Sequence, residues 1–88
     1  MSYEIKFYKE AYKNLHKQDN KTRNRILDHL SLISENPRDP ELDIKKMQGV
    51  DNQFRLRIGS FRVVYSIHNN ELIVIVIKLG PRGDVYKI

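Results

Sequence analysis

The stretch FRLRIGSFRVVY, residues 54–65, decides the fold because it holds both strands of a hairpin and the turn between them. Gly59-Ser60 is predicted to form a two-residue type II′ turn, since glycine at the first central position supplies the backbone angles that this turn needs. Alternating side chains predict strands over 53–58 and 61–68. One face of the hairpin is apolar: Phe54, Leu56, Ile58, Phe61, Val63 and Tyr65. The other face carries Arg55, Arg57 and Arg62.

A two-residue turn places Arg57 directly opposite Arg62. Like charges in opposite positions destabilise a sheet by up to about 1 kcal/mol. An anion between the two guanidinium groups would turn their repulsion into attraction. The hairpin therefore predicts an anion-binding site as well as a fold.

Upstream of the hairpin, the sequence predicts one strand and two helices. Alternation predicts a strand over 3–8, and apolar residues at helical spacing predict a short helix around 8–15, with Tyr12 in the core. A second helix over 21–35 is expected to be capped by Asp19 or Asn20 and to end before Pro37. Its buried face is expected to be Ile26, Leu27, Leu30 and Ile33.

Downstream of the second helix, residues 36–42 form a connector and DIKKMQG, residues 43–49, leads into the strands. Asn69-Asn70 is predicted to form a type I′ turn, followed by a last strand over 72–79. This register places Ile77 opposite Arg62 and Lys78 opposite Phe61. We therefore expect a single α+β domain over residues 1–88, in the order strand, helix, helix and three strands. Both helices should pack on one face of an antiparallel sheet.

The composition fits a globular protein with a basic surface. The 88 residues are 40% hydrophobic and 31% charged, and the net charge is +5. A positive surplus favours nucleic acid as a partner. No apolar run is long enough to span a membrane, the N-terminal residues do not read as a signal peptide, and the lack of cysteine fits a cytoplasmic protein. Because His16, His29 and His68 lack metal-ligand spacing, we expect neither a metal site nor a cofactor.

The predicted register gathers candidate site residues at one end of the sheet. The chain leaves the last strand at the end where the hairpin turns, so Arg82 and Tyr86 are expected near Arg57 and Arg62. Arg55 lies one pleat away, roughly 7 Å along the strand. Such a group suits metal-independent phosphoryl transfer on RNA, in which the ribose 2′-OH attacks the neighbouring phosphate and arginines stabilise the charge on the phosphate oxygens.

His68 is the residue whose charge changes near neutral pH, but its position argues against catalysis. It lies six residues from Arg62 on the same strand, roughly 20 Å away at 3.3 Å per residue. We expect it to pair with Glu71 across the turn.

The chain resembles the RelE group of the RelE/ParE toxin superfamily in the element order, in ENP (35–37), KKMQG (45–49) and FRLRIGSFRVVY, and in the closing LGPRGDVY (79–86). The resemblance implies a toxin that cleaves mRNA in the ribosomal A site, leaves a 2′,3′-cyclic phosphate, and is silenced by a cognate antitoxin in a hetero-oligomer. The family's catalytic arginines correspond to Arg62 and Arg82, and its tyrosine corresponds to Tyr86. Two basic positions, often lysines, correspond to Arg55 and Arg57, and these are expected to bind RNA together with Lys45 and Lys46.

The arginines at 55 and 57 depart from the family pattern. A lysine can lose its proton and act as a base, whereas arginine effectively cannot. The proton of the 2′-OH must then go to Tyr86, to a water or to a ribosomal RNA group. We hypothesise that Arg57 and Arg62 bind the scissile phosphate, that Arg82 assists the leaving 5′ oxygen, and that Tyr86 orients the ribose.

The face that carries the arginines also carries apolar residues in this register: Val64, Ile73, Ile75 and Ile77. If both helices cover the other face, these side chains are uncovered, and an exposed apolar patch is typical of a binding surface. An antitoxin segment laid across them as a helix or an added strand would fit. The alternative is that the sheet curls and the C-terminal tail covers them.

Two other functions fit the same residues. A ParE-like toxin would inhibit DNA gyrase by binding, without nuclease activity, and the fold does not separate it from a nuclease. An inert RNA-binding domain would use the arginines for phosphate contacts alone, with an affinity that falls steeply with salt. The presence of Arg62, Arg82 and Tyr86 together favours the nuclease.

Overall fold

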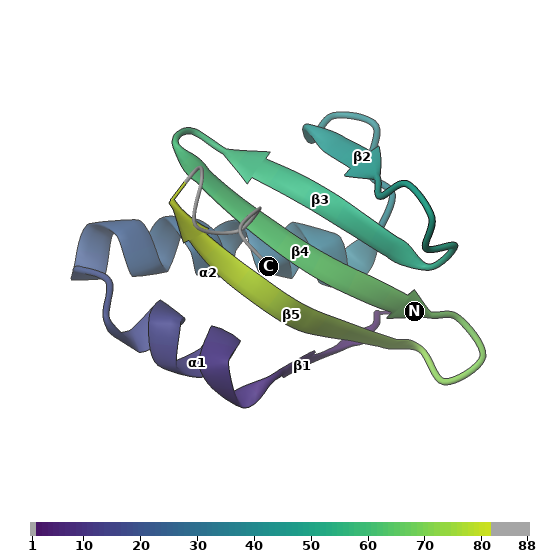
Figure 1. Cartoon of the computed structure of the whole chain (residues 1–88), viewed down its shortest axis with the longest axis horizontal. Helices are drawn as coiled ribbons and strands as arrows, with labels where there is room; N and C mark the ends of the chain where they lie inside the picture. The colour runs from purple at the N-terminus through teal and green to yellow at the C-terminus, as the bar shows by residue number, and fades with distance from the viewer. Residues whose placement is uncertain (1, 82–88) are drawn as a thin grey trace.

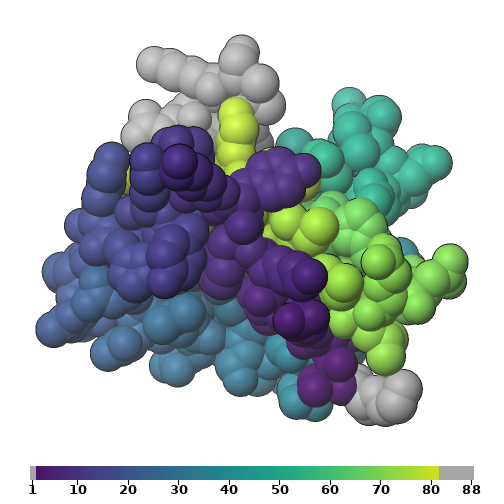
Figure 2. Space-filling model, turned by 90° about the horizontal axis from the view of Figure 1, so that it is seen from below, coloured from purple at the N-terminus to yellow at the C-terminus, as the bar shows by residue number. Residues whose placement is uncertain are grey.

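The computed structural model describes residues 2–81. In these residues the chain forms β1 (Glu4–Phe7), α1 (Lys9–His16), α2 (Asn20–Glu35), β2 (Ile44–Lys46), β3 (Gln53–Ile58), β4 (Phe61–His68) and β5 (Ile73–Pro81). Both helices lie on one side of a single sheet (Figure 1), and the N-terminal segment, purple to blue, forms one continuous side of the molecule (Figure 2). The predicted α+β class and element order are confirmed. Within residues 2–81, neither helix has the length and hydropathy needed to cross a membrane.

The strand order in the sheet is β1-β5-β4-β3-β2. Two features differ from the expectation. The segment expected to lead into the strands contains a short edge strand, β2, antiparallel to β3. At the other edge β1 runs parallel to β5, so the sheet is mixed. Beyond β1, Tyr3 N donates to Ser34 O at 2.7 Å, and Ser34 Oγ donates to Tyr3 O at 2.6 Å, which joins this edge to the end of α2.

The hairpin forms as the sequence predicts. Arg57 lies opposite Arg62 and Ile58 opposite Phe61. Gly59 has a φ of 59°, the positive value that a type II′ turn needs at its first central position. A Cβ at Gly59 would lie 3.2 Å from Arg25 Nη1 of α2, so the turn also approaches the helix closely.

The register predicted between β4 and β5 is wrong by three residues at the end of the sheet next to the Gly59-Ser60 turn. His68 lies opposite Ile73, because residues 69–72 form a longer turn in which Leu72 takes the left-handed conformation with a φ of 54°. A bulge then adds one more residue in β5 between the partners of Val64 and Tyr65. As a result Arg62 lies opposite Gly80 rather than Ile77, and Phe61 opposite Pro81 rather than Lys78.

Helix α2 begins and ends for the reasons expected. The Asp19 carboxylate accepts a hydrogen bond from Thr22 N at 3.1 Å and caps α2, which lowers the pKa of Asp19. Asn36, before Pro37, is already extended. Tyr65 is fully buried and donates its hydroxyl to Pro37 O at 2.7 Å, and burial raises the pKa of that phenol.

Two expected core residues are not buried. Tyr12 is 52% exposed and packs edge-on against Phe7 and His16, and Leu27 is 41% exposed. The short α1 presents only Ala11 and Leu15 as buried residues, so its aromatic side chain lies at the rim. The core is formed by α1, α2 and one face of the sheet: Ala11, Leu15, Ile26, Leu30, Ile33, Phe54, Leu56, Ile58, Val63, Tyr65, Ile67, Val74, Val76 and Leu79.

Candidate nucleic-acid interface

The face of the sheet turned away from α1 and α2, here called the outer face, carries most of the basic side chains of the strands. Alternation along each strand and the observed pairing place five of them in two adjacent rows across the sheet. The arginine row consists of Arg57, Arg62 and Gly80. The lysine row consists of Lys45, Arg55, Val64 and Lys78.

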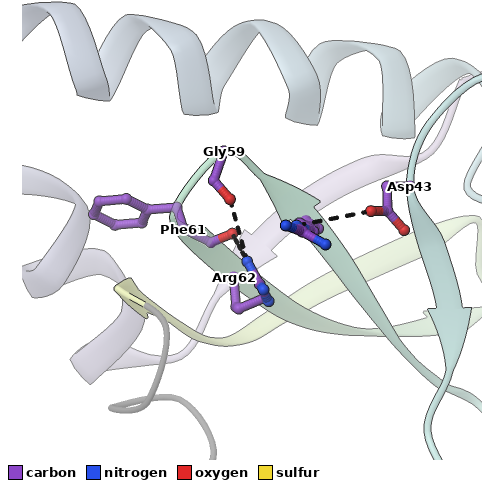
Figure 3. Close-up of polar contacts among 5 residues, drawn as sticks. Asp43, Gly59, Phe61 and Arg62 are labelled. Carbon is purple, nitrogen blue, oxygen red and sulfur yellow. Dashed lines mark hydrogen bonds and ion pairs between the residues drawn. The ribbon is translucent and has the colours of Figure 1, made fainter.

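Arg62 is held at the hairpin by its own backbone. Its Nη1 donates to Gly59 O at 3.3 Å and to Phe61 O at 3.1 Å (Figure 3), and the residue is only 4% exposed. Its Nε is buried and has no hydrogen-bond partner among residues 2–81. Leaving a buried donor unsatisfied costs about 1–3 kcal/mol, and more for a charged group. An acceptor such as a phosphate oxygen would remove this cost.

Arg57 has an acidic neighbour, Asp43, that the sequence pattern does not predict. Its Nε lies 4.0 Å from Asp43 Oδ2, and the two side chains are 52% and 48% exposed. The Arg57 N–H also donates to Asp43 O at 2.9 Å, which extends the pairing of β2 with β3. Asp43 was missed because its approach to Arg57 depends on β2, a strand that the sequence pattern did not predict.

These contacts explain how two arginines can stand opposite each other without an anion. The Arg62 guanidinium is directed to the turn carbonyls (Figure 3). The Arg57 guanidinium is paired with Asp43. Each cation therefore has its own partner. The pair at Arg57 is exposed and long, so its contribution is at most about 1 kcal/mol.

The other predicted basic residues separate by face. Arg55 lies one pleat from Arg57 on the outer face, and Lys45 lies beside it on β2. Lys46 lies opposite Phe54, a core residue, so its side chain belongs to the opposite face. Lys78 was expected opposite Phe61, on the core side, and instead joins Arg55 on the outer face because of the register.

The predicted Arg82 and Tyr86 lie outside the described residues. The last described residue, Pro81, pairs with Phe61, next to the Gly59-Ser60 turn. Their placement near Arg57 and Arg62 stays a prediction.

The remaining expectations for the outer face concern His68 and the apolar residues. His68 lies opposite Ile73 rather than Glu71, and its Nε2 is 2.9 Å from Ser66 Oγ. Val64 is only 6% exposed, so it is not uncovered as expected. Ile73, Ile75 and Ile77 are half-buried.

Residues 2–81 contain no cluster of three or more side chains able to hold a metal ion.

Comparison with known proteins gives consistent matches over the whole length. Residues 5–86 match the family described as ParE toxin of type II toxin–antitoxin system, parDE. The chain is similar to a putative toxin RelE1 of Methanocaldococcus jannaschii, with 30% identity over 99% of the chain and 98% of the relative. It is equally similar to a putative RelE-like toxin protein of Escherichia coli, with 30% identity over 100% and 94%. The RelE–RelB complex of Pyrococcus horikoshii contains a chain that superposes with a TM-score of 0.81 at 28% identity, covering 94% of this chain and 98% of that one.

Proposed function

The chain belongs to the RelE/ParE superfamily of toxins, as a RelE-like toxin of a toxin–antitoxin system, and we propose that it is an endoribonuclease that cleaves mRNA in the ribosomal A site. The observation that supports this proposal most strongly is the environment of the Arg62 side chain. A buried guanidinium that is anchored at a turn and whose Nε has no partner in the described part of the chain, with Arg57 opposite, is a preformed site for an anionic oxygen. Such preorganised charge is what stabilises a phosphoryl-transfer transition state.

In the proposed reaction the ribose 2′ oxygen forms a bond to the adjacent phosphorus, and the bond from phosphorus to the 5′ oxygen breaks. The products are a 2′,3′-cyclic phosphate and a 5′-hydroxyl end. Arg57, the more exposed arginine, meets the phosphate first, and Arg62 holds an oxygen that becomes more negative in the transition state. Arg82 stabilises the charge on the leaving 5′ oxygen, which takes its proton from water, and Tyr86 orients the attacking ribose.

The 2′-OH proton goes to a group other than Arg55 or Arg57. A guanidinium stays protonated in proteins and cannot accept it. Tyr86, a water or a ribosomal RNA group takes the proton. The metal-independent course of the reaction is part of the proposal, and adding a chelator to the cleavage assay tests it.

The test uses ribosomes stalled on a defined mRNA, the same mRNA without ribosomes, and mapping of new 5′ ends. We expect cuts in the A-site codon on the ribosome only, lost in Arg62→Ala and retained in Arg38→Ala, a control that removes an exposed arginine near Phe54. Arg57→Gln provides a second variant at a position that is not buried. Cleavage by Arg62→Ala as fast as by the parent protein would refute the assignment.

A second candidate is inhibition of DNA gyrase, because the matching family is described as ParE toxin. The two functions share the fold and differ in their assays. If the protein cuts no RNA on ribosomes and blocks gyrase supercoiling of a plasmid, the gyrase function replaces the nuclease. Salt-sensitive RNA binding without either activity would indicate an inert RNA-binding domain.

We propose a cognate antitoxin as the protein partner, in a toxin–antitoxin hetero-oligomer. The similar chain from Pyrococcus horikoshii is in a RelE–RelB complex, which supports this assignment. Co-expression with the neighbouring reading frame and co-purification of the two products tests it.

A further inference from the structure

The lysine row has no role in the reaction described above, although it crosses four strands next to the arginine row. Lys45, Arg55, Val64 and Lys78 stand opposite one another on β2, β3, β4 and β5. Three of these four positions are basic: Lys45 lies directly beside Arg55, and Lys78 lies beyond Val64 on β5. We infer that Lys45 and Lys78, together with Arg55, bind the RNA phosphate next to the scissile one, an inference that rests on the proposed function.

The charges of the two rows differ in a way that favours a second phosphate. In the arginine row the charge of Arg57 is partly balanced by Asp43. Neither Lys45 nor Lys78 has an ion-pair partner within residues 2–81. Lys45 and Lys78 therefore hold positive charge that no ion pair within residues 2–81 neutralises. Ammonium groups on long stems suit a phosphate that must be held but not oriented.

The spacing of the rows fits the RNA backbone. Successive rows on one face of a strand are two residues apart, roughly 7 Å. Neighbouring phosphates of an extended RNA strand have a comparable separation. An RNA strand whose scissile phosphate lies at Arg62 would place its next phosphate level with the buried Val64, against the side chains of Arg55 and Lys78 on either side of it, if it ran along β4.

The same register limits the number of phosphates bound. The next row on β3, β4 and β5 consists of Gln53, Ser66 and Ile75, none of which is charged, and its basic residue, Lys6, lies beyond them on the edge strand β1. The basic track therefore covers two consecutive phosphates on these strands. The bulge in β5 matters here, because it is what brings Lys78 opposite Val64 on the outer face.

The first experiment pairs protein variants with chemically altered mRNA on the ribosome. Two mRNAs carry an uncharged methylphosphonate, one at the phosphate on the 5′ side of the scissile position and one on the 3′ side. On unaltered mRNA we expect Lys78→Gln to slow single-turnover cleavage about tenfold, the loss of one charge-assisted contact. On the altered mRNA whose uncharged phosphate is the one that Lys78 binds, the parent protein and Lys78→Gln should cleave at the same rate, because the contact is already lost. An equal slowing on all three mRNAs would overturn the inference, as would no slowing at all.

The second experiment does not depend on cleavage and so separates failure of this inference from failure of the proposed function. Binding of a 2′-O-methyl hexanucleotide is followed as the NaCl concentration rises. Lys45→Gln and Lys78→Gln should each reduce the slope of log affinity against log salt by about 0.7. Lys9→Gln is the matched control, since it removes the same charge from an exposed position of α1, on the helix side of the sheet, and should leave the slope unchanged. Equal slopes for Lys78→Gln and Lys9→Gln would refute the inference, as would a hexanucleotide that does not bind at low salt.

Discussion

Asp43 limits how strongly Arg57 attracts RNA, so Asp43→Asn is expected to tighten RNA binding. The carboxylate lies 4.0 Å from Arg57 Nε and competes with a phosphate for that guanidinium. The substitution keeps the size of the side chain and removes only its charge. The contact between Arg57 N and Asp43 O is made by the backbone, so the pairing of β2 with β3 is retained.

The size of the effect follows from the distance and the exposure. Two unit charges 4 Å apart interact by about 1 kcal/mol in bulk water, and the water value applies because both side chains are about half exposed. Measured surface pairs rarely exceed that energy. A gain of about 1 kcal/mol corresponds to roughly fivefold tighter binding. It should fade as salt shortens the screening length to about 10 Å at 0.1 M and less above it.

The assay is binding of the 2′-O-methyl hexanucleotide at several NaCl concentrations. Asp28→Asn is the control, because Asp28 is exposed on α2 and its loss changes the net charge by the same amount. Asp43→Asn should bind several-fold more tightly than Asp28→Asn at low salt, with the two converging at high salt. Equal affinities at low salt would show that Asp43 does not restrain Arg57.

Three further predictions concern stability. Tyr65→Phe leaves the carbonyl of Pro37 without its buried partner and should destabilise the fold by about 1–3 kcal/mol in urea unfolding. Gly59→Ala places a side chain at a φ of 59° and should cost about 1–2 kcal/mol in the same assay. Asp19→Ala removes the cap on Thr22 N, and its melting temperature should be below the parent's at pH 7. Because the cap holds the pKa of Asp19 below its ordinary 3.8, the stability it contributes is complete above that pH and disappears as the pH falls further, so the two melting temperatures should converge.

Controls separate these effects from nonspecific ones. Tyr12→Phe removes the same hydroxyl from a side chain that is 52% exposed and should leave stability unchanged. A Tyr65→Phe protein as stable as Tyr12→Phe would contradict the buried hydrogen bond. Gly49→Ala is the control for Gly59→Ala, because Gly49 also has a positive φ, 81°, but a Cβ there would meet nothing within 4 Å. Its loss of stability reports backbone strain alone, whereas that of Gly59→Ala includes the contact with Arg25. A gap between parent and Asp19→Ala that persisted undiminished well below pH 3.8 would contradict the charged cap.

The hairpin could be predicted from sequence because everything that fixes it is local. Gly59 determines the turn, and alternation then determines which residues stand opposite and which face carries Arg55, Arg57 and Arg62. Strand β2 could not be predicted in the same way, since three residues, two of them lysines, give no clear alternation. It forms because β3 offers it a partner.

The β4–β5 register could not be predicted because it depends on two irregularities without a sequence signature. Asn69-Asn70 suggested a tighter turn than the one that includes Leu72, and nothing in the apolar run of β5 marks the bulge. The same error concealed Lys78, since one residue of slip moves a side chain to the other face. The place of Arg62 opposite Arg57 was predicted correctly because it relies only on the hairpin, whereas the roles of Arg62, Arg82 and Tyr86 remain predictions.

The edges of the sheet determine how the protein behaves once no partner covers it. Unpaired strand edges recruit other strands and lead to aggregation, and short or lysine-bearing edges resist this. β2 has three residues, two of them lysines, and the outer side of β1 is bonded at Tyr3 to Ser34 of α2. A second copy of the chain would therefore have few unpaired backbone groups at either edge with which to add a strand to the sheet. A toxin released from its antitoxin is expected to persist as dispersed monomers, available to its target, rather than being lost to its own precipitation.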